Sequence, residues 1–212
     1  MYKMRKKWRN VIAMAICSAL LMIFTACDKD DESGNSKQDS FNGTLTAKVE
    51  NGASYEAQIS KVWALYDAKV NSAGDLSGRM LSTGDFVNGG FTINLPDMPS
   101  SFLMNIQTFF ASGLSIDAEL EYSDPDTRLL DADFFGISSD DKYVDYFVYT
   151  NGGTKRAICL FVFAESDATV KGGSVNVKLQ RGWNRIYWTP SDKKVSSSAP
   201  DGMKWYLSSN IK

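Results

Sequence analysis

The chain of 212 residues contains no histidine. A protein without histidine has no Ser-His-Asp or Cys-His catalytic set, no imidazole general base and no His-ligated zinc or haem. The sequence also has neither the Gly-rich loop that cradles phosphates at a helix start nor the dinucleotide-binding fingerprint. These absences exclude the commonest hydrolases and nucleotide-dependent enzymes. We therefore expect a protein that is not an enzyme and that holds no metal and no cofactor.

Long apolar runs are also scarce. The run from Val11 to Ala26 has 16 residues, which is shorter than the roughly 20 needed to cross a bilayer core. The residues before it include no acidic residue and five basic ones, Lys3, Arg5, Lys6, Lys7 and Arg9. A basic start followed by a short apolar run that ends in small residues predicts a secretory signal peptide over residues 1–26.

This run ends in residues that resemble the lipobox of bacterial lipoproteins, Phe24-Thr25-Ala26-Cys27. The resemblance implies cleavage before Cys27 after its sulfur has been diacylated. The residues that follow include Lys29-Asp30-Asp31-Glu32, which resemble the acidic export tag of Bacteroidetes-type surface lipoproteins. Together they imply a lipid anchor at Cys27 in the outer membrane, with the protein facing the cell exterior. Two or three acyl chains would hold it stably, since each buried methylene contributes about 0.8 kcal/mol.

The charge balance changes when the signal peptide is removed. The whole chain has 23 Lys and Arg against 25 Asp and Glu, and the first 26 residues contain five of the basic and none of the acidic ones. The remaining 18 against 25 give a net charge of about −7. A surface of this sign repels phosphate backbones, so we expect no nucleic-acid partner.

The three cysteines leave no disulfide in the mature protein. Cys17 departs with the signal peptide and Cys27 takes the lipid, so Cys159 has no second thiol. Cys159 lies in an apolar stretch that predicts a buried strand. Residues 27–40 combine the lipidated N-terminus with a polar segment typical of a flexible tether, and a β domain is expected over 41–212.

Alternation of apolar and polar residues, interrupted by Gly, Asn, Asp and Pro, predicts short strands throughout that domain. The strands are expected at 45–49, 59–68, 91–95, 114–122, 128–135, 143–149, 156–163, 174–179, 185–189 and 203–208. Asn51-Gly52 and Asn88-Gly89 predict tight turns. The fold class is therefore all-β, most simply an antiparallel β-sandwich of the transthyretin or immunoglobulin type. The alternatives are a β-barrel or two small β lobes divided between Pro96 and Asp126.

Two further patterns refine this fold. Residues 89–96, Gly-Gly-Phe-Thr-Ile-Asn-Leu-Pro, resemble the strand that closes transthyretin-like and carboxypeptidase-regulatory-like sandwiches. Apolar residues at helical spacing from Phe102 to Phe110, after a cap at Pro99-Ser100-Ser101, predict one short helix near 100–111. We expect this helix to lie on the core or to join two halves of the domain.

Aromatic residues gather near the C-terminus and form the candidate ligand-binding set, which comprises Trp183, Tyr187, Trp188, Trp205 and Tyr206. Neighbours such as Tyr187 and Trp188 must point to opposite faces of a strand, so some rings lie away from the inner face. Exposed rings could stack on sugars, and buried rings would serve packing. The stretch 182–187 with Trp205 resembles a C-terminal pattern of β-sandwich lipoproteins from gut Bacteroidetes, which implies no biochemical role.

Carboxylates supply a second candidate site. Two facing carboxylates suffice for glycoside hydrolysis without histidine, and alternating acids on the predicted strands share faces: Asp117 with Glu119 and Glu121, and Asp131 with Asp133. Acids on a solvated face give the same pattern. The acidic loops at 124–127 and 138–141 could gather oxygen ligands for calcium, although ordinary turns also use these residues.

Three functions follow from these patterns. The first is a cell-envelope lipoprotein that acts as a non-enzymatic binding module, for a glycan or an envelope protein. The second is a structural or adhesive, pilin-like surface protein, which would show an exposed edge strand. The third and most remote is a histidine-free glycoside hydrolase.

Overall fold

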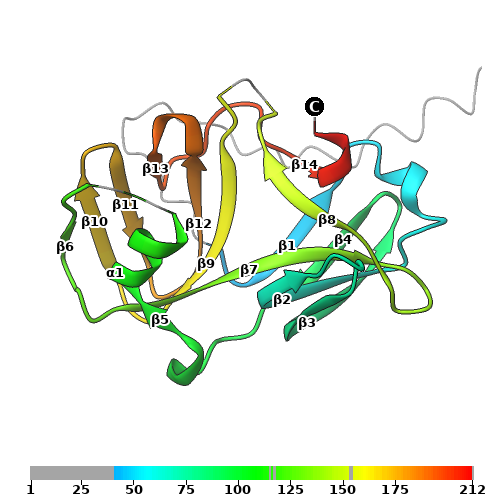
Figure 1. Cartoon of the computed structure of the whole chain (residues 1–212), viewed down its shortest axis with the longest axis horizontal. Coiled ribbons are helices and arrows are strands. Elements are labelled where there is room, and N and C mark those ends of the chain that lie inside the picture. Colours follow the sequence, from blue (N-terminus) through cyan, green and yellow to red (C-terminus); the bar gives the residue numbers. More distant parts are fainter. Residues whose placement is uncertain (1–40, 115, 117, 153–154, 212) are drawn as a thin grey trace, which may run out of the picture. The chain divides into compact units, whose positions relative to one another are not determined.

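Short antiparallel strands build most of this protein, as seen in a computed structural model that describes residues 41–211 except 115, 117 and 153–154 (Figure 1). The described residues fall within one unit of the chain. The signal peptide, lipidation site and tether predicted over residues 1–40 lie outside them. No helix in the described part has the length and apolar character of a membrane span.

Fourteen strands of the described residues join into one sheet. They are β1 (Thr44–Lys48), β2 (Lys61–Val70), β3 (Leu76–Val87), β4 (Gly90–Asn94), β5 (Met104–Asn105), β6 (Glu121–Tyr122), β7 (Arg128–Ile137), β8 (Tyr143–Thr150), β9 (Ile158–Ala164), β10 (Ala168–Gly172), β11 (Val175–Leu179), β12 (Gly182–Thr189), β13 (Lys194–Ser196) and β14 (Lys204–Leu207). The main path runs β1-β4-β3-β2-β7-β8-β9-β12-β13-β11-β10-β6, with β14 added to β8 and β5 to β7. Among the described strands this path has two ends, so the sheet is not closed into a barrel. The all-β, sandwich-like class is confirmed.

The predicted helix near 100–111 is a series of short helical turns. A 3₁₀ turn η2 (Ser100–Phe102), the strand β5, one turn of α1 (Ile106–Thr108) and a π-turn η3 (Phe109–Gly113) follow one another. The predicted cap at Pro99-Ser100-Ser101 is wrong: the side chain of Asn105 caps α1 by accepting from Gln107 N at 2.8 Å. The helix begins late because Met104 and Asn105 pair with β7 instead. Other 3₁₀ turns are η1 (Gly52–Tyr55), η4 (Pro190–Asp192) and η5 (Ser208–Asn210).

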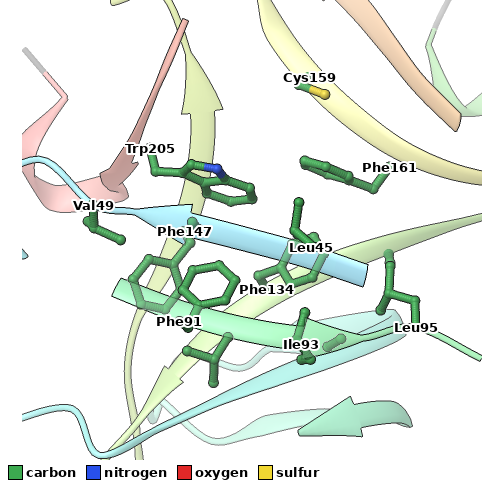
Figure 2. Packing of buried hydrophobic residues seen from close by; sticks show 14 of the residues in the cluster. Leu45, Val49, Phe91, Ile93, Leu95, Phe134, Phe147, Cys159, Phe161 and Trp205 are labelled. Carbon is green, nitrogen blue, oxygen red and sulfur yellow. The ribbon is translucent and has the colours of Figure 1, made fainter. Parts of the chain in front are cut away.

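The larger core lies between β1 and β4 on one side and β7, β8, β9 and β14 on the other (Figure 2). At its centre, Trp205 stacks on Phe161 with ring centroids 5.3 Å apart and meets Phe91 edge-on at 5.4 Å. The main chain fixes this arrangement, because Glu50 N donates to Trp205 O at 2.8 Å. The curled sheet thereby folds back on itself and encloses its own apolar face.

A second core lies under α1 and η3, where Ile106, Phe109 and Phe110 are buried. The strand β9 serves both cores by alternation: Phe161 and Phe163 enter the larger core, and Val162 and Ala164 the second. These two cores share the walls β9 and β12 within one unit. A third, smaller cluster on β2 and β7 comprises Leu65, Phe135 and Ile137.

The strand predicted over 114–122 is wrong except at its end, β6. Leu114 and Ile116 instead enter the second core beside the helical turns. Conversely, β3 escaped prediction from Leu76 to Asp85, because most of its side chains are exposed and show no apolar alternation. The predicted tight turns are confirmed, since Asn51 and Asn88 adopt φ of 56° and 52°.

Candidate functional site

The C-terminal aromatic residues do not form an exposed strip. Trp183, Tyr187 and Trp205 are 3%, 2% and 5% exposed and belong to the larger core. The ring of Trp183 meets Phe163 edge-on, and its Nε1–H donates to Pro96 O at 2.9 Å. Because these three rings are buried, they pack in the core and are not available to stack on a sugar, as had been expected.

The other two members of that set are half-buried. Trp188 packs against the second core. Tyr206 lies opposite Val148 in the pairing of β14 with β8. The five rings therefore do not form one exposed ligand-binding surface, although Trp205 also lines the cavity described next.

The sheet forks at the middle of β7 (Figure 1). From Leu129 to Ala132 the strand pairs with β9, and from Phe134 to Ile137 it pairs with β8. The strands β8 and β9 meet again only at Thr150 and Ile158. Between these points lies an opening of about 160 Å³, bounded by three strands. We call it the fork cavity.

The fork cavity combines charged, aromatic and apolar walls. Asp131, Asp133 and Arg156 line it together with Tyr146 and Tyr149. Its floor reaches the larger core, including Phe161 and Trp205. Ligand sites typically have this composition, with mostly apolar walls and a few polar groups that fix orientation.

Asp131 and Asp133 lie on the same face of β7, as their spacing predicted, and both line the cavity. Burial raises the pKa of Asp131. The pKa of Asp133 rises to about 6, first because protein atoms desolvate it and second because of the nearby charge of Asp131. Solvent still reaches Asp133, which is exposed at the cavity mouth, and screening by that solvent limits the effect. No ion pair or side-chain hydrogen bond joins either carboxylate to another described residue.

A row of aromatic residues crosses the sheet and ends at the cavity. Trp63 on β2 lies opposite Phe135 on β7, which lies opposite Tyr146 on β8. The ring of Tyr143 supports this row by packing edge-on against Phe135 at 6.0 Å. Tyr146 is 45% exposed and belongs to both the row and the cavity. Sequence reasoning missed Tyr146, although its alternation with buried Phe147 could have marked it as outward-facing.

The remaining predicted acids do not assemble into a site. Only Glu121 of the 117–121 set lies in a strand, where it pairs with Lys171, and Asp117 is outside the described residues. The strand on which Glu119 and Glu121 were expected to share a face begins only at Glu121.

The two acidic loops use their carboxylates within their own turns. Asp124 accepts from the hydroxyls of Thr127 at 2.8 Å and Ser166 at 3.1 Å, which lowers its pKa. Asp140 pairs with Lys142 at 2.8 Å and accepts a hydrogen bond from Ser138, so its pKa falls to about 2. Across the described residues, no group of three or more acidic or cysteine side chains could hold a metal ion.

Comparison with known proteins gives no relative: no protein-family model, curated protein or solved structure matches this chain. The chemistry of the site therefore has to be argued from its own residues.

Proposed function

We propose that the protein is an outer-membrane lipoprotein of a Bacteroidetes-type cell, anchored through Cys27 and facing the exterior, whose β domain binds carbohydrate without transforming it. The lipobox-like and acidic motifs at residues 24–32 support the location. The net charge of the mature chain, about −7, argues against nucleic acid as the partner.

The observation that carries the binding role is the exposed ring of Tyr146, which lines the fork cavity together with Asp133. Aromatic side chains present a large apolar face together with a polar handle, and this face suits the C–H surface of a sugar. Carboxylates accept hydrogen bonds strongly, so Asp131 and Asp133 suit its hydroxyl groups. Phe135 is buried in the same row and Trp63 is partly buried, so Tyr146 is the ring of this row that a ligand can reach most readily.

The same carboxylates argue against hydrolysis. Glycosidases place two carboxyl groups on opposite sides of the scissile bond. Asp131 and Asp133 project from one face of one strand, so they reach a bound sugar from the same side. This arrangement favours binding.

The adhesive alternative has less support. The main path of strands ends at β1 and at β6. The edge β6 has two residues, and such a short edge offers little backbone to another subunit, so the candidate for an exposed edge is β1. That end of the chain is tied down, because Glu50 N donates to Trp205 O at 2.8 Å and Phe41 N donates to Trp183 O at 3.3 Å. An edge fixed in this way is a poor candidate for exchange with another subunit.

The anchoring is tested with Cys27→Ala. We expect the wild-type protein to enter the detergent phase and to incorporate radiolabelled palmitate, and the variant to do neither. Ser40→Ala, in the predicted tether, is the control and should behave as wild type. Equal partitioning and labelling of the Cys27 variant would remove the lipid anchor from the proposal.

The binding is tested on a glycan array with detergent-extracted, full-length protein. Tyr146→Ala should abolish the signals that the wild type gives. The matched control is Phe102→Ala, because this ring is 42% exposed against 45% for Tyr146 but lies outside the cavity. A blank array for the wild type, or signals that survive in Tyr146→Ala, would contradict the proposal.

A further inference from the structure

The size of the fork cavity limits what can enter it. Pockets for drug-sized ligands measure about 300–1,000 Å³, whereas this cavity measures about 160 Å³. Such a space suits a single sugar ring, and three strands close it on its sides. A chain could not pass through it, so the ligand has to enter by its end.

The charged side chains that line the cavity favour some sugar rings over others. With both carboxylates ionised, Asp131 and Asp133 outweigh Arg156 by one negative charge. The two carboxylates also repel each other, as the effect of Asp131 on Asp133 shows. A positive group placed between them would relieve that repulsion and gain charge-assisted hydrogen bonds.

An ammonium group fits this site better than a metal ion. Calcium takes 6–8 oxygen ligands, and the described residues offer no group of three candidate metal ligands. An ammonium has three N–H donors, for which the carboxylates of Asp131 and Asp133 are acceptors. A nearby aromatic face adds about 0.5–1 kcal/mol of cation–π attraction at an exposed position, and Tyr146 can supply one.

We propose that the fork cavity binds the terminal unit of a glycan through a protonated amine, with Asp131 and Asp133 as acceptors and Tyr146 against the sugar ring. This inference rests on the proposed carbohydrate binding. It adds that the recognised unit is an end of the glycan and is an amino sugar.

The test is calorimetric titration of the detergent-solubilised, full-length protein at neutral pH. The probes are glucosamine, N-acetylglucosamine, glucose and Nα-acetyl-lysine amide. Glucosamine is expected to bind at least about tenfold more tightly than the two neutral sugars, because they lack the charged donor. The lysine derivative should bind more weakly than glucosamine, because it offers the ammonium without the ring.

Two variants assign the effect to the cavity. Asp131→Asn and Asp133→Asn should each weaken glucosamine binding about 10- to 100-fold, while glucose affinity changes little, because an amide still accepts from hydroxyls. Asp97→Asn removes an exposed carboxylate outside the cavity and serves as the control. Thermal melts of all variants establish that they are folded.

The pH dependence supplies an independent readout. Asp131, Arg156, Tyr146, Tyr149 and Cys159 are the charged or titratable groups that share the cavity with Asp133. Because the pKa of Asp133 is about 6, glucosamine binding should weaken as the pH falls from 7 to 5. Glucose binding should not follow this trend.

The possible outcomes separate the two proposals. If neutral sugars bind as tightly as glucosamine, carbohydrate binding stands and the ammonium assignment fails. If glucosamine does not bind but the array gives signals for neutral glycans, carbohydrate binding again stands and the ammonium assignment fails. If the lysine derivative binds as tightly as glucosamine, the site recognises an amine without a sugar, and the assignment fails in favour of a peptide. If no probe binds and the array is blank, both proposals fail.

Discussion

The ionised side chain of Asp133 lowers the stability of the folded protein, and Asp133→Asn is expected to relieve this cost. Desolvation and the charge of Asp131 raise its pKa from 3.8 to about 6. A raised carboxyl pKa means that the folded protein holds its proton more tightly than the unfolded chain does. The stabilisation from that proton is complete below pH 3.8 and is lost as the pH rises through about 6.

The size of the effect follows from the shift. A shift from 3.8 to about 6 corresponds to ~3 kcal/mol at about 1.36 kcal/mol per pKa unit if it is fully expressed. Solvent reaches Asp133 at the cavity mouth, and exposed charges are strongly screened. We therefore expect Asp133→Asn to be more stable than wild type by about 1 kcal/mol at pH 7.5, with the difference vanishing near pH 4.

Urea unfolding followed by far-ultraviolet circular dichroism at pH 4, 5, 6 and 7.5 measures this difference. The control Asp97→Asn replaces an exposed carboxylate outside the cavity and should stay within about 0.5 kcal/mol of wild type throughout. If Asp133→Asn is less stable than wild type at pH 7.5, or if its advantage does not change with pH, then Asp133 is not a desolvated carboxylate and the electrostatic argument for the cavity is refuted.

Two predictions concern the core. Trp205→Ala should lower the free energy of unfolding by about 3–5 kcal/mol, since the ring is 5% exposed. Trp188 is half-buried, so Trp188→Ala should lower it clearly less. Equal, small decreases of the free energy of unfolding in urea titrations would contradict the assignment of Trp205 to the core. Gly90→Ala should lower the free energy of unfolding by about 1–3 kcal/mol, because the new Cβ would lie 2.2 Å from Ala47 O. Gly113→Ala should be tolerated, because its Cβ would meet nothing within 4 Å. Equal melting temperatures of these two variants would show that β4 does not approach β1 closely.

Local patterns predicted the elements whose two faces differ. The alternation separates buried from exposed positions throughout β1, from Asp131 to Phe134 in β7 and from Asp145 to Phe147 in β8, so these stretches and the common face of Asp131 and Asp133 could be read from the sequence. The turns at Asn51 and Asn88 were equally local, because few residues other than glycine tolerate a positive φ.

The fork cavity could not be predicted in this way. It exists because β7 exchanges one neighbour for another at Asp133, and the choice between β8 and β9 depends on residues far apart in the chain. The prediction that the C-terminal aromatic rings bind a ligand rested on a local pattern for a related reason. Period two places Tyr187 and Trp188 on opposite faces of β12, but β12 lies between two cores, so both rings have core to pack against. A strand with two buried faces reads as a nearly continuous apolar run, and Asn184 and Arg185 interrupt that run in β12.

The most direct test of the account is to locate the bound carbohydrate on the protein. Isotope-labelled, full-length protein in detergent is titrated with the glycan that binds best on the array, and its backbone amide resonances are followed. The account predicts the largest shift changes around Asp131 and Asp133, at Tyr146 and at the neighbouring Leu160, which surround the fork cavity. Shift changes centred on another part of the sheet, or none at saturating glycan, would contradict it.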